Sequence, residues 1–435
     1  MMDKPGTPAR RARRFAGMGF SVAGSYLGYL AQHAFLSEEK RAEKLKSAHG
    51  RAAKRMRDEM QSLRGPAMKL GQALSLHAGV LPDETILELS KLQMQAPGMH
   101  PSLMRAQFRG CMGADPDDVF REFDEKPFAA ASLGQVHRAI TKRGDRVAVK
   151  IQYPGIRDAI ENDFKWFRTV SRPLQATGHM PRLAIDELQE QISAETDYVR
   201  EADNIDFFKE ELAPLKFVRV PRVYRDLSGP QVLTMSLIAG RHMEDFLSQR
   251  PTRKTCDLVG EHLFDLYYFQ LLEVGAFHAD PHAGNYLFGA DGAIGLIDFG
   301  CIKRLSPEFV DSLRELYLFP GARDSAEFRA LLDKRHRRFS TKTRPAARRA
   351  LIQMAETFYG KVYPPDVSRD SDTYDFGDGT VLQEYTHASQ ELLKSRGAMP
   401  EYIFLARAEL GLYSALTRLR ARVHTSRIVR QYLRR

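Results

Sequence analysis

The spacing of the apolar residues changes along the chain, and this change constrains the fold more than any other feature of the sequence. Apolar residues recur at helical spacing between Ser37 and Gly65, but from Val119 onward they alternate with polar ones, as strands do. The runs FAAASLGQVHRAI and RVAVKIQ flank the turn cluster TKRGD, and the runs FVRVPRVY and QVLTMSLIAG follow a long helical stretch. This order of strand, strand, helix, strand, strand, with helices on both sides, predicts an α+β fold.

The strand RVAVKIQ contains a lysine among apolar residues. With a period of two, Val147, Val149 and Ile151 share one face of the strand, and Lys150 lies on the other. A lysine in an apolar strand is costly unless it reaches water or has an anionic partner. The strand is therefore either an edge strand with Lys150 in solvent, or Lys150 has a partner with a function.

Three other polar groups complete a pattern typical of phosphoryl transfer. The predicted helix 156–211 carries acids near its middle, a His-Ala-Asp loop places Asp280 five positions before Asn285, and Asp298 stands in the run LIDFG after a predicted hairpin with Asp291-Gly292 at its turn. Such sites use a lysine on the phosphates, an acid that holds the lysine, an Asp and an Asn on metal ions, and an Asp at the acceptor.

A second Asp-Phe-Gly, at residues 375–377, lacks a preceding apolar strand. We discount it and expect the acidic run SRDSDTYDFGDGT to be an exposed loop. His278 and His282 flank Asp280, and we expect them to support the loop by hydrogen bonds rather than to bind metal.

Cysteine and charge exclude other classes of protein. The three cysteines, at 111, 256 and 301, build neither a disulfide framework nor a CxxC metal knuckle, which indicates a reducing compartment. The net charge of +10 first suggests a nucleic-acid binder, but residues 1–36 hold +4 and residues 418–435 hold +7, so the rest is near neutral. This distribution does not suit a phosphate-tracking groove, and no nucleic-acid partner is expected.

The N-terminus carries a membrane signal. Residues 15–36 are uncharged, follow the basic cluster RRARR and contain Gly24 and Gly28 in a GxxxG spacing. The stretch is long enough to span a bilayer, although polar residues dilute it. A packing helix, an amphipathic surface helix and part of a cleaved transit peptide remain open as alternatives. We expect the two basic ends of the chain to face a membrane.

The motifs together resemble the UbiB/AarF family of atypical, protein-kinase-like proteins, which is tied to ubiquinone and other isoprenoid-lipid metabolism. KLGQ at 69–72 is similar to the family's KxGQ motif, AAASLGQVHRA to its Ala-rich loop, ETDYVREA to its E-x-D helix, and FHADPHAGN and LIDFG to its catalytic and metal loops. Ser236 departs from the family pattern, where Glu is usual beside the adenine-facing hinge, and Ala283 replaces a proline. The resemblance implies a two-lobed protein-kinase-like fold with an N-terminal helical extension that carries KxGQ.

The resemblance also implies roles for single residues. The catalytic set is Asp280 with Lys69, Gln72, Glu195 and Asp197. Lys69 and Gln72 lie on the KxGQ helix that covers the cleft, and Glu195 and Asp197 face this helix. The nucleotide-binding set is Ala129, Ala130, Ala131, Ser132, Lys150 and Glu201, with Glu201 as the ion-pair partner of Lys150. The metal ligands are Asn285 and Asp298. Gln135 adds a candidate amide contact to the nucleotide.

The expected function is that of an ATP-binding atypical kinase or ATPase, with ATP and Mg²⁺ as cofactors, that supports ubiquinone or related isoprenoid-lipid synthesis at a membrane. Replacing glycines by alanines narrows how backbone N–H groups approach phosphates, which disfavours ordinary protein phosphorylation. The alternatives are a non-catalytic nucleotide-binding scaffold for lipid-synthesis enzymes, and a kinase acting on a protein or small molecule.

The expected partners are membrane lipids, isoprenoid or quinone precursors or their biosynthetic enzymes, and a homodimer is allowed. The expected location is cytoplasmic and membrane-associated, at the inner face of a bacterial membrane, or in an organelle if the N-terminus is a transit peptide. The expected domains are a basic N-terminus with an uncharged helix (1–36), a helical extension (37–115), a small lobe (116–240) and a helical large lobe (241–435).

Overall fold

The chain divides into two compact units. A computed structural model describes residues 13–14, 17, 38–63, 71, 85, 88–89, 99–131, 133–170, 189–190, 192–279, 283–320, 325–339, 345–363, 372–394 and 400–433. The first unit comprises residues 1–200 and 223–237, and the second comprises residues 201–222 and 238–435.

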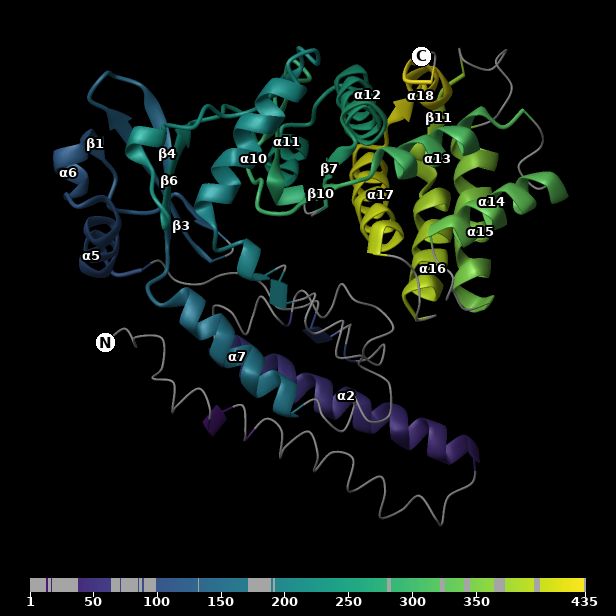
Figure 1. Cartoon of the computed structure of the whole chain (residues 1–435), viewed down its shortest axis with the longest axis horizontal. Helices are drawn as coiled ribbons and strands as arrows, with labels where there is room; N and C mark the ends of the chain where they lie inside the picture. The colour runs from purple at the N-terminus through teal and green to yellow at the C-terminus, as the bar shows by residue number, and fades with distance from the viewer. Residues whose placement is uncertain are drawn as a thin grey trace. The chain divides into compact units, whose positions relative to one another are not determined.

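The first unit is built on a five-stranded antiparallel sheet (Figure 1). The strand order is β1-β3-β4-β6, and β2 pairs with β3 beside this path. The strands are β1 (Phe120–Phe123), β2 (Ala129–Ala131), β3 (Gly134–Thr141), β4 (Arg146–Gln152) and β6 (Val232–Ser236). The predicted strand pair around TKRGD is therefore confirmed as β3 and β4.

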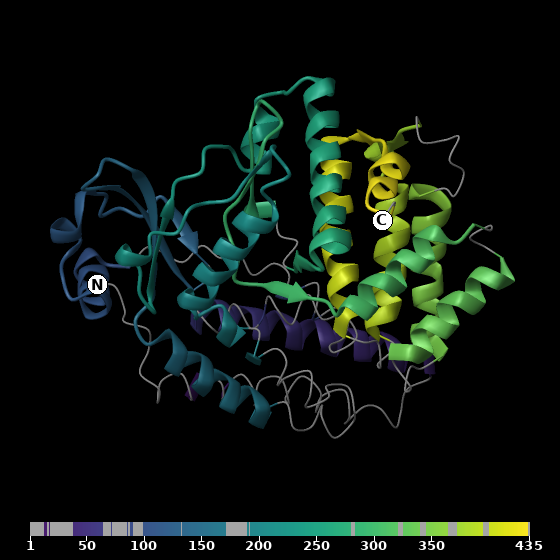
Figure 2. The same cartoon turned by 45° about the horizontal axis from the view of Figure 1, so that its top comes forward.

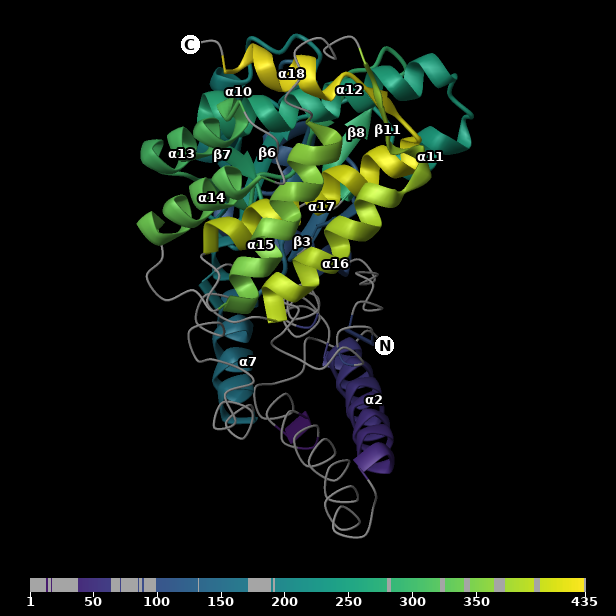
Figure 3. The ribbon, with the colours of Figure 1, turned by 90° about the vertical axis from the view of Figure 1, so that its right-hand side faces the viewer.

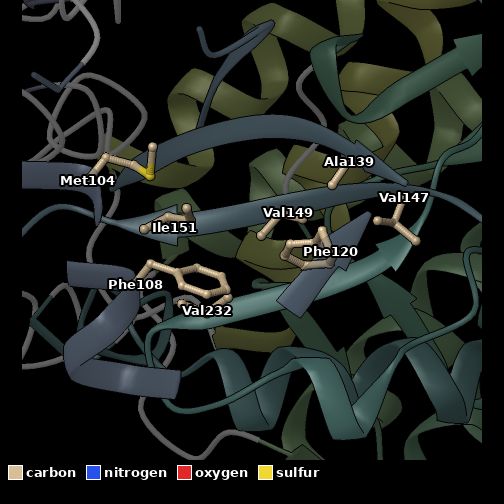
Figure 4. Packing of buried hydrophobic residues seen from close by; sticks show 8 residues of the cluster. All are labelled: Met104, Phe108, Phe120, Ala139, Val147, Val149, Ile151 and Val232. Carbon is tan, nitrogen blue, oxygen red and sulfur yellow. The ribbon is translucent and has the colours of Figure 1, made fainter. Parts of the chain in front are cut away.

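The core of this unit lies on one face of the sheet (Figure 4). Val147, Val149 and Ile151 of β4 are fully buried there, as the alternation predicts, against Met104 and Phe108 of helix α5 (Pro101–Met112). Helix α5 begins with a proline in its first turn and ends at Gly113, whose φ of 74° is a left-handed conformation that glycine adopts readily. One face of β4 is thus filled by apolar packing, which leaves the opposite face for Lys150.

The helices of the first unit confirm one prediction and correct another. Helix α2 (Glu38–Leu63) ends just before the predicted stop at Gly65-Pro66. The single helix expected over 156–211 is wrong. Helix α7 covers Ile156–Val170, a turn lies at residues 195–196, and helix α10 covers Tyr198–Glu211. Glu195 and Asp197 therefore lie before a helix rather than in the middle of one.

The second unit is mainly helical. Helix α12 (Arg253–Phe269) and helix α17 (Pro400–Leu419) pack side by side (Figure 2). The other helices are α11 (Met243–Ser248), α13 (Pro307–Leu318), α14 (Ala326–Phe339), α15 (Pro345–Thr357), α16 (Thr380–Lys394) and α18 (Thr425–Gln431), with single turns at η1 (Arg225–Leu227, in the first unit), η3 (Ala283–Asn285) and η6 (Phe376–Asp378). Two π-helical turns, Gln270–Val274 and Phe358–Val362, extend α12 and α15.

Three small sheets accompany these helices. Strand β7 (Ala276–His278) pairs antiparallel with β10 (Ile302–Arg304), and β8 (Tyr286–Phe288) forms with β9 (Ile294–Leu296) the predicted hairpin, whose Gly292 has a φ of 81°. Strand β5 (Val218–Arg219) pairs parallel with β9. These pairings bring the segments on either side of the Asp280 and Asp298 motifs together.

The acidic run near residue 375 is not simply an exposed loop. Strand β11 (Tyr374–Asp375) pairs with β12 (Arg422–Val423), and Phe376 is buried. Asp375 accepts a hydrogen bond from the backbone N–H of Gly377, which lowers the pKa of Asp375, and it pairs with Arg422 at 3.0 Å. The second Asp-Phe-Gly is thus a local turn held by an arginine of the C-terminus.

Three of the C-terminal arginines have partners within the second unit, so part of the positive charge expected to face a membrane is balanced by contacts of the fold. Arg418 pairs with Glu244, Arg427 lies 3.4 Å from Glu261, and Arg430 lies over the ring of Tyr363. In the described part of the chain no helix is both long and apolar enough to cross a bilayer. Residues 15–36 lie outside that part, apart from Gly17.

Candidate functional site

Lys150 occupies the centre of the first unit's sheet. Strand β4 lies between β3 and β6, and Lys150 pairs in register with Val136 on one side and Leu233 on the other. The side chain is 7% exposed, and its Nζ lies 5.1 Å from the ring centroid of Tyr198. The alternative of an edge strand with Lys150 in solvent is therefore wrong. A central, nearly buried lysine is costly to fold and indicates a function.

The Ala-rich segment forms a tight hairpin with β3. Ala129, Ala130 and Ala131 pair with Val136, Gln135 and Gly134, and Ser132 lies outside the described residues. At Gly134 an added Cβ would lie 2.3 Å from the carbonyl oxygen of Ile151, so only glycine permits this approach of β3 to β4. The alanines are thus held in a β ladder rather than in an open, glycine-rich loop.

Gln135 serves the structure rather than the nucleotide. Its side chain is 1% exposed, its Oε1 accepts from the N–H of Met99 at 2.7 Å, and its Nε2 lies 2.8 Å from Nε2 of His137. Nδ1 of His137 lies 2.7 Å from the carbonyl oxygen of Asp124, and burial lowers the pKa of His137. A neutral histidine that donates to Asp124 and accepts from Gln135 satisfies this chain. The expected amide contact of Gln135 to the nucleotide is therefore not supported.

The Glu195-Thr196-Asp197 segment is anchored through its middle residue. The carbonyl oxygen of Thr196 accepts from Nε2 of Gln152 at 2.6 Å, and its hydroxyl lies 3.3 Å from Nε of Arg157. Gln152 ends β4, so this contact joins the segment to the strand of Lys150. Asp197 accepts from the N–H of Arg200 at 3.0 Å and so caps the start of α10.

In the second unit, β7 leads directly to the loop of Asp280. The N–H of Ala279 donates to the carbonyl oxygen of Cys301 at 2.9 Å, which ties the residue before Asp280 to the residue after Gly300. Gln270, in the π-helical turn, accepts from the N–H of His278 at 3.1 Å. Asp280 itself lies outside the described residues, but the backbone that leads to it is fixed next to the Asp-Phe-Gly segment.

His278 supports this segment as expected. Its Nε2 lies 2.6 Å from the carbonyl oxygen of Asp298, so the ring donates a hydrogen bond to the backbone of the predicted metal ligand. His278 is 5% exposed. His282 lies outside the described residues.

The β8–β9 hairpin brings the two predicted metal ligands to the same end of a ladder. Tyr286 pairs with Leu296, and one step further the N–H of Ile297 donates to the carbonyl oxygen of Asn285 at 3.2 Å. Asn285 therefore lies across from the residue that precedes Asp298. The side chain of Asp298 accepts from the N–H of Gly300 at 2.9 Å, which closes a turn over Phe299.

Helix α10 holds the same turn from another side. Glu201, 2% exposed, accepts from the N–H of Phe299 at 3.4 Å, and Asn204 donates to the carbonyl oxygen of Phe299 at 2.9 Å. The two side chains are three residues apart and share a helix face. Both backbone groups of Phe299 are thus held by one helix, and its ring packs 5.9 Å from that of Phe208.

The donor set fits magnesium better than a metal that needs a full protein cage. Among the residues that the structure describes, no three His, Cys, Asp or Glu side chains gather into a metal cluster. A carboxylate and an amide oxygen, Asp298 and Asn285, suit Mg²⁺, which keeps waters and substrate phosphates as its other ligands. These two residues would hold the ion, and the ion would neutralise charge on the phosphates.

The predicted residues fall into three groups. Ala129, Ala130, Ala131, Lys150, Glu195 and Asp197 belong to the first unit, and Glu201, Asn285 and Asp298 belong to the second. Lys69, Gln72, Ser132 and Asp280 lie outside the described residues. The pairing of Lys150 with Glu201, and the packing of the KxGQ helix over a cleft, stay predictions.

Sequence reasoning missed two side chains that hold the backbone of the site: Asn204, which contacts the Asp-Phe-Gly turn, and Gln270, which contacts His278. The only signal for Asn204 was its spacing of three from Glu201, which places both on one helix face. Gln270 gave none, because a π-helical turn leaves no periodic trace in so short a segment.

Protein kinases and proteins with their fold combine two such units: a mainly antiparallel sheet with a buried lysine on a central strand, and a mainly helical unit with an Asp-Phe-Gly turn. Residues 91–331 match the family described as the ABC1 atypical kinase-like domain. The chain belongs to this family, also known as UbiB/AarF.

Two relatives illustrate the range of the family. The chain is 30% identical over 432 residues to the atypical kinase COQ8B, mitochondrial, of Rattus norvegicus, and the match covers 96% of this chain and 79% of that protein. It is 34% identical over 269 residues to the protein ACTIVITY OF BC1 COMPLEX KINASE 7, chloroplastic, of Arabidopsis thaliana, across 60% of this chain and 38% of that protein. The chain thus spans about two fifths of the length of this longer plant relative.

A solved structure shows the same fold. Rv3197 of Mycobacterium tuberculosis, solved in complex with erythromycin, is 25% identical to this chain and superposes with a TM-score of 0.61. The superposition covers 90% of this chain and 97% of Rv3197.

Proposed function

We propose that the protein binds Mg²⁺·ATP and hydrolyses it, as an atypical kinase-like ATPase that supports ubiquinone or related isoprenoid-lipid synthesis at a membrane. Lys150 contacts the α- and β-phosphates and pairs with Glu201. Asp298 and Asn285 bind Mg²⁺, and Asp280 orients the attacking group. The Ala129–Ala131 hairpin covers the phosphates. Membership of a family that includes COQ8B supports the link to quinone synthesis.

One observation carries this proposal. The backbone around Asp298 is held by Glu201, Asn204 and His278, through contacts of 3.4, 2.9 and 2.6 Å to the turn. A metal ligand must be fixed before the substrate arrives, because ordering it later costs free energy of binding. Three separate side chains that fix one acidic turn support a site prepared for an ion.

The Ala-rich hairpin favours hydrolysis over phosphorylation of proteins. Because Ala129, Ala130 and Ala131 are paired with β3, their backbone is less able to wrap around a triphosphate than a glycine-rich loop is. The same hairpin supports the second candidate, a scaffold that binds nucleotide without turnover. The two candidates differ in one respect only, namely the release of phosphate.

The remaining residues complete the proposal. Lys69 and Gln72 of the KxGQ motif act with Glu195 and Asp197 near the acceptor side of the site. The segment 195–197 is rigid enough for this role, because Thr196 is hydrogen-bonded to Gln152 and Arg157. The partners are membrane lipids and isoprenoid or quinone precursors or their biosynthetic enzymes.

Phosphate release by the purified full chain with Mg²⁺, in lipid and in detergent, tests the proposal. We expect activity that Asp298→Asn lowers by at least a hundredfold. The matched control is Asp375→Asn, which changes the other Asp-Phe-Gly and should keep activity within twofold. Activity of the parent protein no higher than that of Asp298→Asn in both media would refute the ATPase, and nucleotide binding without turnover would favour the scaffold.

A further inference from the structure

A cavity lies within the helices of the second unit, apart from every residue assigned above. Side chains of helices α13 to α17 line it, and its volume is about 90 Å³. Figure 3 shows these helices. The cavity volume is several times the volume of about 10–15 Å³ that a single water molecule needs. Much of its wall lies beyond residue 331, where the match to the family model ends.

The wall is mostly apolar. Leu351, Met354 and Ala355 of α15 line one side, and Leu405 and Ala406 of α17 line another. An apolar group that fills such a space gains roughly 25 cal/mol for each Å² removed from water. The wall alone would suit any apolar molecule.

Arg335 of α14 gives the cavity a preference for ligands that carry a hydrogen-bond acceptor. The residue is 5% exposed, and its Nε donates to the hydroxyl of Ser312 at 2.8 Å. The guanidinium lies 4.9 Å from the ring centroid of Phe309 and 5.2 Å from that of Tyr402. Its buried Nη2 has no acceptor among the described residues. A buried donor without a partner costs roughly 1–3 kcal/mol, so an acceptor in the cavity would be stabilising.

The other charged groups of the cavity do not supply the missing anion. Glu409 accepts from the hydroxyl of Tyr385, and burial raises the pKa of Glu409 to about 8, so its carboxyl is mainly neutral at pH 7. Asp333 is already paired with Arg348. Arg335 therefore remains a buried cation beside two aromatic rings, one hydroxyl and the mainly neutral carboxyl of Glu409, whose pKa it lowers in part.

We propose that this cavity binds an amphipathic carboxylate, with its apolar chain against α15 and α17 and its carboxylate on Arg335. A carboxylate accepts a charge-assisted hydrogen bond from Nη2 and neutralises the buried guanidinium. The neutral Glu409 carboxyl adds no repulsion against the anion. The site is separate from the proposed nucleotide site, so the two proposals stand or fall independently.

Calorimetric titration of the full chain with decanoate at pH 7, below its micellar concentration, tests the site. Decanol, with the same chain length but no charge, is the matched ligand. We expect decanoate to bind at least tenfold more tightly than decanol, and we expect Arg335→Gln to remove this preference. Ala355→Phe, which fills the cavity, should abolish the binding of both ligands. Thermal unfolding of each variant checks that it is folded.

Equal affinity of the parent protein and a folded Arg335→Gln for decanoate would overturn the proposal. Decanoate binding that persists in a folded Ala355→Phe would also overturn the proposal, because the decanoate would then bind outside this cavity. No binding to the parent protein, with Ala355→Phe more stable than the parent, would show a packing defect rather than a site.

Discussion

Glu409 is a carboxylic acid in an environment far from that of water. It is half-buried on α17 near tyrosines, and desolvation raises the pKa of its carboxyl from 4.5 to about 8. The folded protein therefore keeps a proton that the unfolded chain has already lost. Between these two values the folded state binds one more proton, so the free energy of unfolding falls as pH rises.

We predict that Glu409→Gln flattens this dependence. One proton changes the free energy of unfolding by about 1.4 kcal/mol per pH unit, so the stability of the parent protein should fall relative to the variant by that slope between pH 5 and pH 8. Gln keeps an oxygen that accepts from Tyr385. Urea unfolding of both proteins across this range measures the difference. Parallel pH profiles would show that Glu409 ionises normally.

The sequence pattern predicted the face of the strand on which Lys150 lies, but not which strands pair with that strand. The period of two correctly placed Val147, Val149 and Ile151 in the core and Lys150 on the opposite face. The same pattern left open whether the strand was central or at an edge, because alternation does not report which strands pair. Gln135 was assigned to the nucleotide because its hydrogen-bond partners, Met99 and His137, are not visible in a linear pattern.

At the scale of elements, α10 carries most of the site's organisation. Asp197 caps its start, Glu201 and Asn204 hold Phe299, and Phe208 packs on the Phe299 ring. Periodicity alone predicted an unbroken helix here, since acids and apolar residues keep helical spacing across the break. The break depends on side-chain to backbone hydrogen bonds at Thr196 and Asp197, which compete locally with helix formation.

The cap gives a prediction that separates stability from catalysis. Asp197→Ala should lower the free energy of unfolding by about 1 kcal/mol, because the N–H of Arg200 loses its acceptor. Asp197→Asn keeps an acceptor and should leave stability unchanged. Phosphate release by a stable Asp197→Asn then reports on the carboxylate itself. Full activity of Asp197→Asn would remove Asp197 from the proposed catalytic set and leave it as a cap.

Asn204 offers a test of how α10 positions the metal ligand. Asn204→Ala removes the donor to the Phe299 carbonyl without touching Asp298 or Asn285. We expect the Mg²⁺ concentration for half-maximal phosphate release to rise at least fivefold. Lys209→Ala, an exposed change on the same helix, is the control and should leave it unchanged. An equal Mg²⁺ requirement in all three proteins would show that the turn is held without Asn204.

At the scale of the whole molecule, the structure changes what the charge of +10 means. Three C-terminal arginines form ion pairs with acids of the second unit, namely Arg418, Arg422 and Arg427. These acids balance part of the positive charge of the C-terminus. The basic N-terminal cluster, next to the uncharged residues 15–36, remains the candidate for membrane contact. Basic residues near an anionic surface contribute roughly 1 kcal/mol each.

Vesicle binding compares the two ends directly. Replacing Arg10, Arg11 and Arg13 by Gln should weaken binding to vesicles containing phosphatidylserine at least tenfold, and the loss should shrink at high salt. The matched variant replaces Arg418, Arg422 and Arg427 by Gln and should bind vesicles like the parent protein. Equal weakening by both variants would restore the C-terminus as a membrane surface.

We propose that Lys150 and a magnesium site bind ATP together. The most direct test is the affinity of the protein for ATP, measured by calorimetry with and without Mg²⁺. The parent protein should bind ATP at least tenfold more tightly with Mg²⁺ than without it. Lys150→Met, which keeps the apolar stem of the side chain, should bind at least tenfold more weakly than the parent while unfolding at a similar temperature. Equal affinity of Lys150→Met and the parent protein, or ATP binding indifferent to Mg²⁺, would contradict the account.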